Sequence, residues 1–214
     1  MDQEPHHHLV LKNDVVKVFE VNLAPRDAMA MHRRDYDEIV VVIGDATTVS
    51  TTPGQPDILR MSKNGQISFE RGGGHLVRNI GQTEYRGVSI NLLRTQTGAR
   101  NLCGKQIPDM KPDCTTASED EKAPRADLPQ FETDQMRVTL TAIRPHQDAR
   151  LGQADRDELI VTIDGAAIAA KTGKGPDQAL APGGTIWIAR GSAKRVLKNF
   201  SDKEVRAVAI AFKP

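Results

Sequence analysis

The sequence predicts an all-β protein made of two tandem β-barrels of the jelly-roll or double-stranded β-helix type. Apolar residues occur in short runs rich in Val, Ile and Thr, separated by Gly-Asp, Pro-Gly, Asn-Gly and Gly-Gly-Gly turn signals, whereas helical spacing is nearly absent. The chain also repeats itself at an offset of about 120 positions. Many short strands with tight turns are typical of antiparallel barrels, and the repeat indicates two of them.

Each strand of the first copy is predicted by one apolar run, and turn residues mark where most of these runs end. Gly44-Asp45 follows the second run, Pro53-Gly54 follows the third, and Asn64-Gly65 separates the fourth from the fifth. The three glycines at 72–74 separate the fifth run from the sixth. The predicted strands are residues 15–23, 38–43, 47–50, 58–61, 66–69, 76–78 and 85–93.

The internal repeat sets the predicted domain boundaries. Matching pairs one repeat apart include Asp35 with Asp155, Glu38 with Glu158, Asn79 with Asn199 and Ile90 with Ile210. We expect a first barrel at 9–94, a linker at 95–128 and a second barrel at 129–213. The linker is predicted from its proline, charged and small polar residues.

Composition argues against several classes of partner. The chain of 214 residues has 29 Lys and Arg against 28 Asp and Glu, so its net charge of +1 gives no broad field for nucleic acid. No apolar run reaches the roughly 18 residues of a membrane helix. We therefore expect neither a nucleic acid nor a membrane partner, and a small molecule as the ligand.

The two cysteines, Cys103 and Cys114, both lie in the polar linker. Free cysteines are usually buried in cores, so this position favours a disulfide, although two unrelated surface thiols are the alternative. A disulfide favours a periplasmic or secreted protein over a cytoplasmic one. One pair of cysteines gives no signal for a structural zinc site.

The candidate site lies in the segment 31–45. Side chains two positions apart in a strand share a face, so His32, Arg34 and Glu38 are expected to point into the first barrel. His75 follows the glycine run and precedes Asn79 by four positions. The three histidines at 6–8 are interpreted as surface residues of an N-terminal arm.

These residues resemble the two motifs of the cupin superfamily, in which three histidines and one glutamate surround a metal inside a small barrel. His32 and Glu38 match the first motif, and Gly65, Gly73, His75 and Asn79 match the second. The chain is similar to a bicupin, because the resemblance covers both copies. Bicupins place in one chain the two barrels that single-barrel cupins pair by dimerisation, which implies a monomer or a homodimer.

The resemblance implies that His32, Glu38 and His75 hold one divalent Fe, Mn, Ni or Zn ion. Arg34, however, occupies the position of the second histidine. At about 4 Å and an effective dielectric near 20, a guanidinium and a dication repel each other by about 8 kcal/mol. In the second copy the corresponding positions are Gly152, Ala154, Glu158 and Arg195, which form no metal set.

Three functions remain open at this point. In the first, the protein binds a small polar or anionic molecule through His32, Arg34, Glu38 and His75. In the second, it is a metal-dependent enzyme of the oxygenase or isomerase type. In the third, it is a structural or storage protein with filled barrels. The sequence does not decide whether there is a reaction, so catalytic residues stay unassigned.

Overall fold

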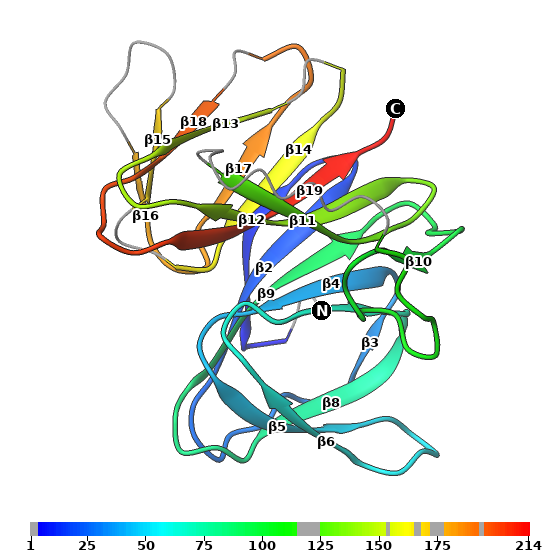
Figure 1. Cartoon of the computed structure of the whole chain (residues 1–214). Helices are drawn as coiled ribbons and strands as arrows, with labels where there is room; N and C mark the ends of the chain where they lie inside the picture. Colours follow the sequence, from blue (N-terminus) through cyan, green and yellow to red (C-terminus); the bar gives the residue numbers. More distant parts are fainter. Residues whose placement is uncertain (1–3, 115–124, 153–154, 165–167, 172–177, 193–194) are drawn as a thin grey trace. The chain divides into compact units, whose positions relative to one another are not determined.

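The computed structural model describes residues 4–114, 125–152, 155–164, 168–171, 178–192 and 195–214. Every regular element in these ranges is a β-strand, as predicted (Figure 1). No described element is a helix with the length and apolarity needed to cross a membrane. The chain divides into two compact units, residues 1–95 and residues 96–214.

The N-terminal unit consists of two antiparallel sheets (Figure 1). The five-stranded sheet has the order β1-β2-β9-β4-β7, and the four-stranded sheet has the order β3-β8-β5-β6. The strands are β1 (His7–Lys12), β2 (Val16–Leu23), β3 (His32–Arg34), β4 (Asp37–Val42), β5 (Ala46–Thr51), β6 (Ile58–Ser62), β7 (Ile67–Glu70), β8 (Gly73–Asn79) and β9 (Tyr85–Leu92).

Seven of these strands coincide with predicted ones to within a few residues, and two were not predicted. His7 and His8, the first residues of β1, were interpreted as part of an N-terminal arm, but they pair with β2. β3 was expected to continue into β4 as one regular strand. A bend at Asp35 and Tyr36 instead places the two strands in different sheets.

The C-terminal unit repeats this arrangement. Its sheets have the orders β10-β11-β12-β19-β14-β17 and β13-β18-β15-β16, so apart from β10 each strand occupies the place of its N-terminal counterpart. The strands are β10 (Arg100–Asn101), β11 (Arg125–Glu132), β12 (Met136–Ile143), β13 (Asp148–Leu151), β14 (Glu158–Thr162), β15 (Ile168–Lys171), β16 (Gln178–Leu180), β17 (Thr185–Ile188), β18 (Arg195–Asn199) and β19 (Val205–Phe212).

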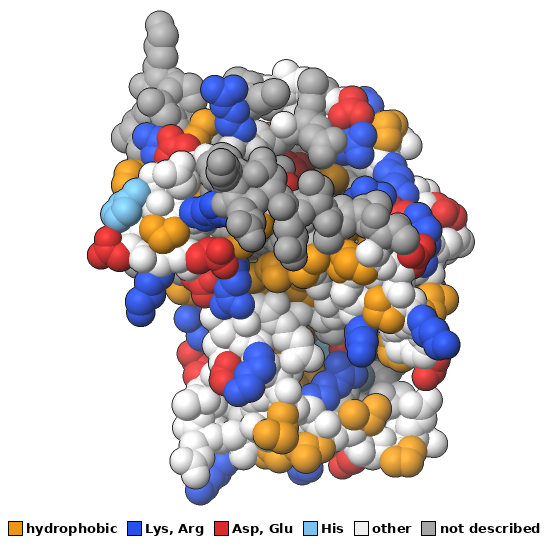
Figure 2. Space-filling view, in the orientation of Figure 1, with side chains coloured by type: hydrophobic (Ala, Val, Ile, Leu, Met, Phe, Trp, Pro, Cys, Tyr) orange, Lys and Arg blue, Asp and Glu red, His pale blue; other side chains and the backbone are white. Residues whose placement is uncertain are grey.

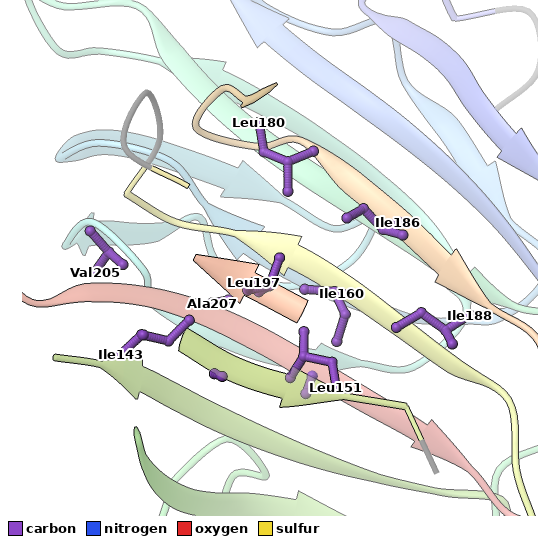
Figure 3. Packing of buried hydrophobic residues seen from close by; sticks show 11 residues of the cluster. Ile143, Leu151, Ile160, Leu180, Ile186, Ile188, Leu197, Val205 and Ala207 are labelled. Atoms are coloured by element: carbon purple, nitrogen blue, oxygen red, sulfur yellow. The ribbon is translucent and has the colours of Figure 1, made fainter. Parts of the chain in front are cut away.

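Aliphatic side chains fill much of the interior of the C-terminal unit. Figure 3 shows Ile160, Ile186 and Leu197 among residues that point toward one another from different strands. Ile160 and Leu197 have no exposed surface, and Ile186 is 5% exposed. Burial of such side chains away from water is the main stabilising contribution in this unit.

The N-terminal unit has a smaller apolar cluster, to which Phe19, Leu23 and Tyr85 contribute. At its other end, β6 is an edge strand with exposed apolar side chains at Ile58, Leu59 and Met61. Figure 2 shows hydrophobic side chains in orange at the end of the unit where β5 and β6 lie. Polar and charged side chains, among them Arg34, Glu38 and His75, are also buried in this unit.

One buried asparagine closes the same corner in each unit. The Asn79 side-chain amide donates hydrogen bonds to three backbone oxygens, and its Oδ1 accepts one from the Gly81 N–H. Asn199 does the same, with Oδ1 accepting from the Ser201 N–H. The acceptor oxygens belong to Leu23, Ala24 and Thr83 in one unit and to Ile143, Arg144 and Lys203 in the other.

Cys103 and Cys114 form a disulfide in the segment that precedes β11. Asn101 organises the same loop, because its side-chain amide donates to the backbone oxygens of Ile107 and Met110. This segment belongs to the compact C-terminal unit, and β10 pairs with β11 there.

Candidate functional site

Four strands of the N-terminal unit bring the predicted residues together. β3 lies antiparallel to β8, and His32 stands directly opposite His75 in this pairing. β4 carries Glu38, which is paired in the other sheet with Glu70 of β7. Because Arg34 reaches across from β3, side chains of both sheets meet in the interior.

The guanidinium of Arg34 bridges two carboxylates. Its Nη1 lies 2.7 Å from Glu38 Oε2 and 2.7 Å from Glu70 Oε2. Arg60 of β6 donates from Nη1 to the other oxygen of Glu70 at 2.5 Å. Arg34 and Glu38 are almost completely buried, at 8% and 2% exposure. Two arginines and two glutamates thus form one continuous ion-pair network.

Glu38 is also bound through its second oxygen. The Ser89 hydroxyl donates to Glu38 Oε1, and the Asn91 amide approaches the same atom at 3.4 Å. Both residues lie on β9, the strand beside β4. Each oxygen of Glu38 therefore accepts hydrogen bonds from the protein itself.

The charges in this network adjust one another's pKa values. Burial by itself lowers the pKa of Arg34, but the carboxylates of Glu38 and Glu70 outweigh it and raise that pKa above its ordinary value. Burial raises the pKa of Glu70, but the charges of Arg34 and Arg60 lower it by more. The pKa of Glu70 is therefore below its ordinary value. Both groups are therefore ionised at neutral pH.

His32 and His75 form an adjacent pair of imidazoles. Their ring centroids are 4.4 Å apart in an edge-to-face arrangement. Burial and the nearby charge of Arg34 lower the pKa of His75 to about 3, so its ring is neutral at neutral pH. His32 Nδ1 lies 2.9 Å from the backbone oxygen of Ala30, so Nδ1 is the N–H donor in this contact.

Three polar atoms of this cluster are buried without a hydrogen-bond partner in the described part of the chain. They are His32 Nε2, Arg34 Nε and His75 Nδ1. Buried polar groups normally have a partner, because each one left without it costs about 1–3 kcal/mol. Three such atoms on neighbouring residues indicate that this interior has a role besides packing.

His7 belongs to the site, contrary to its interpretation as a surface residue. Its side chain is 2% exposed, and its ring lies 5.2 Å from that of His32. Nδ1 of His7 is 2.9 Å from the carboxylate of Glu4, which is itself buried. Burial lowers the pKa of His7 more than Glu4 raises it, so the ring is neutral.

Sequence reasoning also missed Arg60 and Glu70. Glu70 lies 36 positions from Arg34, and nothing in the sequence marks the two as partners. The predicted strand 66–69 stops one residue short of Glu70; extended by that residue, its parity would have placed Glu70 on the same face as Ser68.

The network encloses a cavity of about 60 Å³. Its wall includes Arg34, Glu38, Glu70, His75 and His7, together with small polar side chains of β5, β7 and β9. His32 does not line the cavity and instead packs against the rings of His7 and His75. Three of the four predicted ligand-binding residues thus face one space.

The predicted metal ligands do not form a coordination set as they are arranged. Among the described residues, no group of three or more His, Cys, Asp or Glu side chains is arranged to hold a metal ion. Both oxygens of Glu38 already accept hydrogen bonds, one of them from Arg34. The residues present do not fit a divalent metal, because a fixed positive charge lies in contact with the only carboxylate of the set.

The C-terminal unit has a different interior. The Glu158 carboxylate accepts a hydrogen bond from the Gly152 N–H at 2.7 Å, and Glu158 lines a cavity of about 320 Å³. Arg195, which occupies the position of His75 in the second copy, is not among the described residues that line this cavity. The described wall contains arginine, threonine and acidic side chains but no histidine.

No family model and no curated protein matches the sequence. Among solved structures, AerE from Microcystis aeruginosa is similar over 99% of this chain and 99% of its own, with a TM-score of 0.62 and 11% identity. A protein named as glyoxylate-induced from Pseudomonas aeruginosa gives a TM-score of 0.67 at 13% identity, over 98% of this chain and 82% of its own.

A salicylate 1,2-dioxygenase from Pseudaminobacter salicylatoxidans is similar over 96% of this chain and 75% of its own, with a TM-score of 0.64 and 11% identity. At such identities the likeness concerns the fold and carries no activity over to this chain. These neighbours are cupin-fold proteins, and the chain has the cupin fold along almost its whole length.

Proposed function

We propose that the N-terminal unit binds a small polar molecule in the cavity beside Arg34 and His75. The observation that carries this proposal is that two residues lining the cavity, Arg34 and His75, each have a buried polar atom without a partner among the described residues, Nε and Nδ1 respectively. A ligand with a hydroxyl or carbonyl oxygen supplies the missing acceptor for Arg34 Nε after a small side-chain adjustment. The proposed role is binding, and no catalytic residue is assigned.

The charges of the wall favour an uncharged ligand over an anion. Among the described lining residues, Arg34 and Arg60 are balanced by Glu38 and Glu70. The rings of His7 and His75 are neutral. An anion would have to compete with the two carboxylates for Arg34, whereas a neutral molecule needs only hydrogen bonds.

The size of the cavity restricts the ligand further. One water needs about 10–15 Å³ of such space, so a cavity of about 60 Å³ takes a molecule of a few non-hydrogen atoms. The small side chains of Ser50, Ser68 and Ser89 keep this space open. A protein with a purely structural or storage role has no need for this arrangement, so the cavity favours binding.

The alternative of a metal-dependent oxygenase or isomerase relies on a metal at His32, Glu38 and His75. The neighbour named as a dioxygenase motivates this alternative. The bridge from Arg34 to Glu38 argues against it, because the carboxylate is already neutralised. We therefore favour metal-free binding.

Calorimetric titration with glycolamide and glycolate tests the proposal, since the two probes have the same size and differ in charge. We expect heat of binding for glycolamide and weaker binding for glycolate. Ser50→Leu, which fills the cavity, should abolish binding. Thr47→Leu, on the same strand with the opposite parity, should leave it unchanged. Absence of binding for both probes, or equal binding by Ser50→Leu, would refute the proposal.

A further inference from the structure

In the N-terminal interior, one nitrogen atom of Arg34 contacts two carboxylates. Arg34 Nη1 is 2.7 Å from Glu38 Oε2 and 2.7 Å from Glu70 Oε2, and all three side chains are largely buried. Two carboxylates this close to one point repel each other strongly unless a cation lies between them. The interior therefore requires a positive charge at this position.

The neighbouring imidazoles have the free nitrogen atoms that a metal ion needs. His32 Nδ1 donates to the Ala30 oxygen, and its Nε2 is buried with no hydrogen-bond partner among the described residues. His75 stands opposite in the β-sheet pairing and leaves Nδ1 without a partner. Two imidazoles beside carboxylates are the donor types that bind divalent transition metals, and a hydrogen bond on the far nitrogen orients such a ligand.

We infer that Arg34 takes the place of a divalent cation in this interior and is the side chain that keeps a metal away from His32, Glu38 and His75. The guanidinium satisfies the carboxylates, and it repels any second cation from the imidazoles. It stays charged at every pH at which the protein folds, so its exclusion of metal is permanent. The unit thus contains a latent metal site that one substitution opens.

Metal analysis of Arg34→His tests this inference. The purified variant is incubated separately with Fe(II), Mn(II), Ni(II) or Zn(II), desalted and analysed for bound metal. We expect one equivalent of at least one metal in Arg34→His and none above background in the wild type. The matched control is Arg33→His, which adds a histidine at the neighbouring exposed position and should resemble the wild type. It also corrects for metal held by the histidines at 6–8.

A second substitution locates the metal. Adding His75→Ala to Arg34→His should remove the bound equivalent. If Arg34→His does not fold, Arg34→Gln with Glu70→Gln removes the cation together with one carboxylate, and it should gain metal in the same assay. The inference is overturned if the wild type binds one equivalent of metal that His75→Ala removes. It is also overturned if the variants that lack Arg34 fold but bind no metal. Neither result depends on whether the wild type binds glycolamide.

Discussion

Asn79 and Asn199 are the side chains that tie the corners of the two units. Each is almost fully buried, and each satisfies three backbone oxygens and one backbone N–H. An amide in this position replaces the water that the turn would otherwise need. Removing it leaves several buried polar groups without partners.

We therefore expect Asn79→Ala and Asn199→Ala each to lower the free energy of unfolding by about 3 kcal/mol, since each unsatisfied group costs roughly 1–3 kcal/mol. Urea denaturation measures the change. Gln55→Ala, at an exposed loop position, is the control and should stay within about 0.5 kcal/mol of the wild type. A loss below 1 kcal/mol at both asparagines would contradict the assigned role.

Single residues also show what the sequence was able to predict. Arg34 and Glu38 stand four positions apart, and parity correctly placed both in the interior. Their meeting depends on a bend at Asp35 and Tyr36 that parity alone does not reveal. Glu70 and Arg60 reach the site only through long-range strand pairing, which no local pattern encodes.

At the scale of elements, β1 is attached through a buried carboxylate. Glu4 accepts hydrogen bonds from the His6 backbone, the Ala30 backbone and the rings of His6 and His7. Burial raises the pKa of Glu4, but these hydrogen bonds outweigh it and lower the pKa from 4.5 to about 2. The hydrogen bond to Glu4 raises the pKa of His6 above 6.5, with a further contribution from Asp27.

Because of these pKa shifts, the stability that Glu4 and His6 contribute to the attachment of β1 is greatest within a limited pH range. The Glu4 contribution is complete above pH 4.5 and is lost as pH falls toward 2. The His6 contribution is complete below pH 6.5 and is lost as pH rises through its higher folded pKa. Stability from this cluster is therefore greatest between about pH 4.5 and 6.5.

We expect Glu4→Gln to be less stable than the wild type by roughly 3 kcal/mol at pH 6, a difference that shrinks as pH falls toward 2. Urea denaturation at both ends of this range measures it. Glu20→Gln, at an exposed position on β2, should show no such pH-dependent gap. A gap that stays constant from pH 6 to pH 2.5 would rule out the titration of Glu4 as its cause.

The elements that the sequence missed share one property. β1 and β3 carry histidine and arginine at positions where a strand pattern needs apolar residues. Polar residues are tolerated there because the interior of the N-terminal unit is itself polar. Strands with an uninterrupted run of buried apolar residues on one face, such as β2 and β9, were predicted almost to the residue.

At the scale of the whole molecule, the two units share a strand order and differ in what they enclose. The N-terminal unit surrounds charged side chains and histidines, whereas the C-terminal unit has a large aliphatic cluster. The repeat in the sequence predicted this shared order, because matching positions must form matching strands. It also placed Glu158 at the position of Glu38, and Glu158 lines the C-terminal cavity, whereas Arg195 is not among the described residues that line it.

The disulfide and the only tryptophan both belong to the C-terminal unit, which allows its unfolding to be followed separately. Trp187 lies on β17 with its ring 5.4 Å from that of Phe212. Because closing so short a loop contributes about 3 kcal/mol, reduction of Cys103–Cys114 should lower the free energy of unfolding by that amount and move the tryptophan-detected transition to a lower urea concentration. Cys103→Ser with Cys114→Ser should match the reduced wild type. An unchanged transition would mean that the loop is ordered without the bond.

The corner asparagine makes the same contacts in both units, although the two units enclose different side chains. The same hydrogen bonds close the corner in a unit with buried ion pairs and histidines and in a unit with a large aliphatic cluster, so this corner does not depend on which side chains the unit encloses. Side chains transplanted from the interior of the N-terminal unit to matching positions of the C-terminal unit would therefore enter the same strand arrangement, closed by the same corner hydrogen bonds.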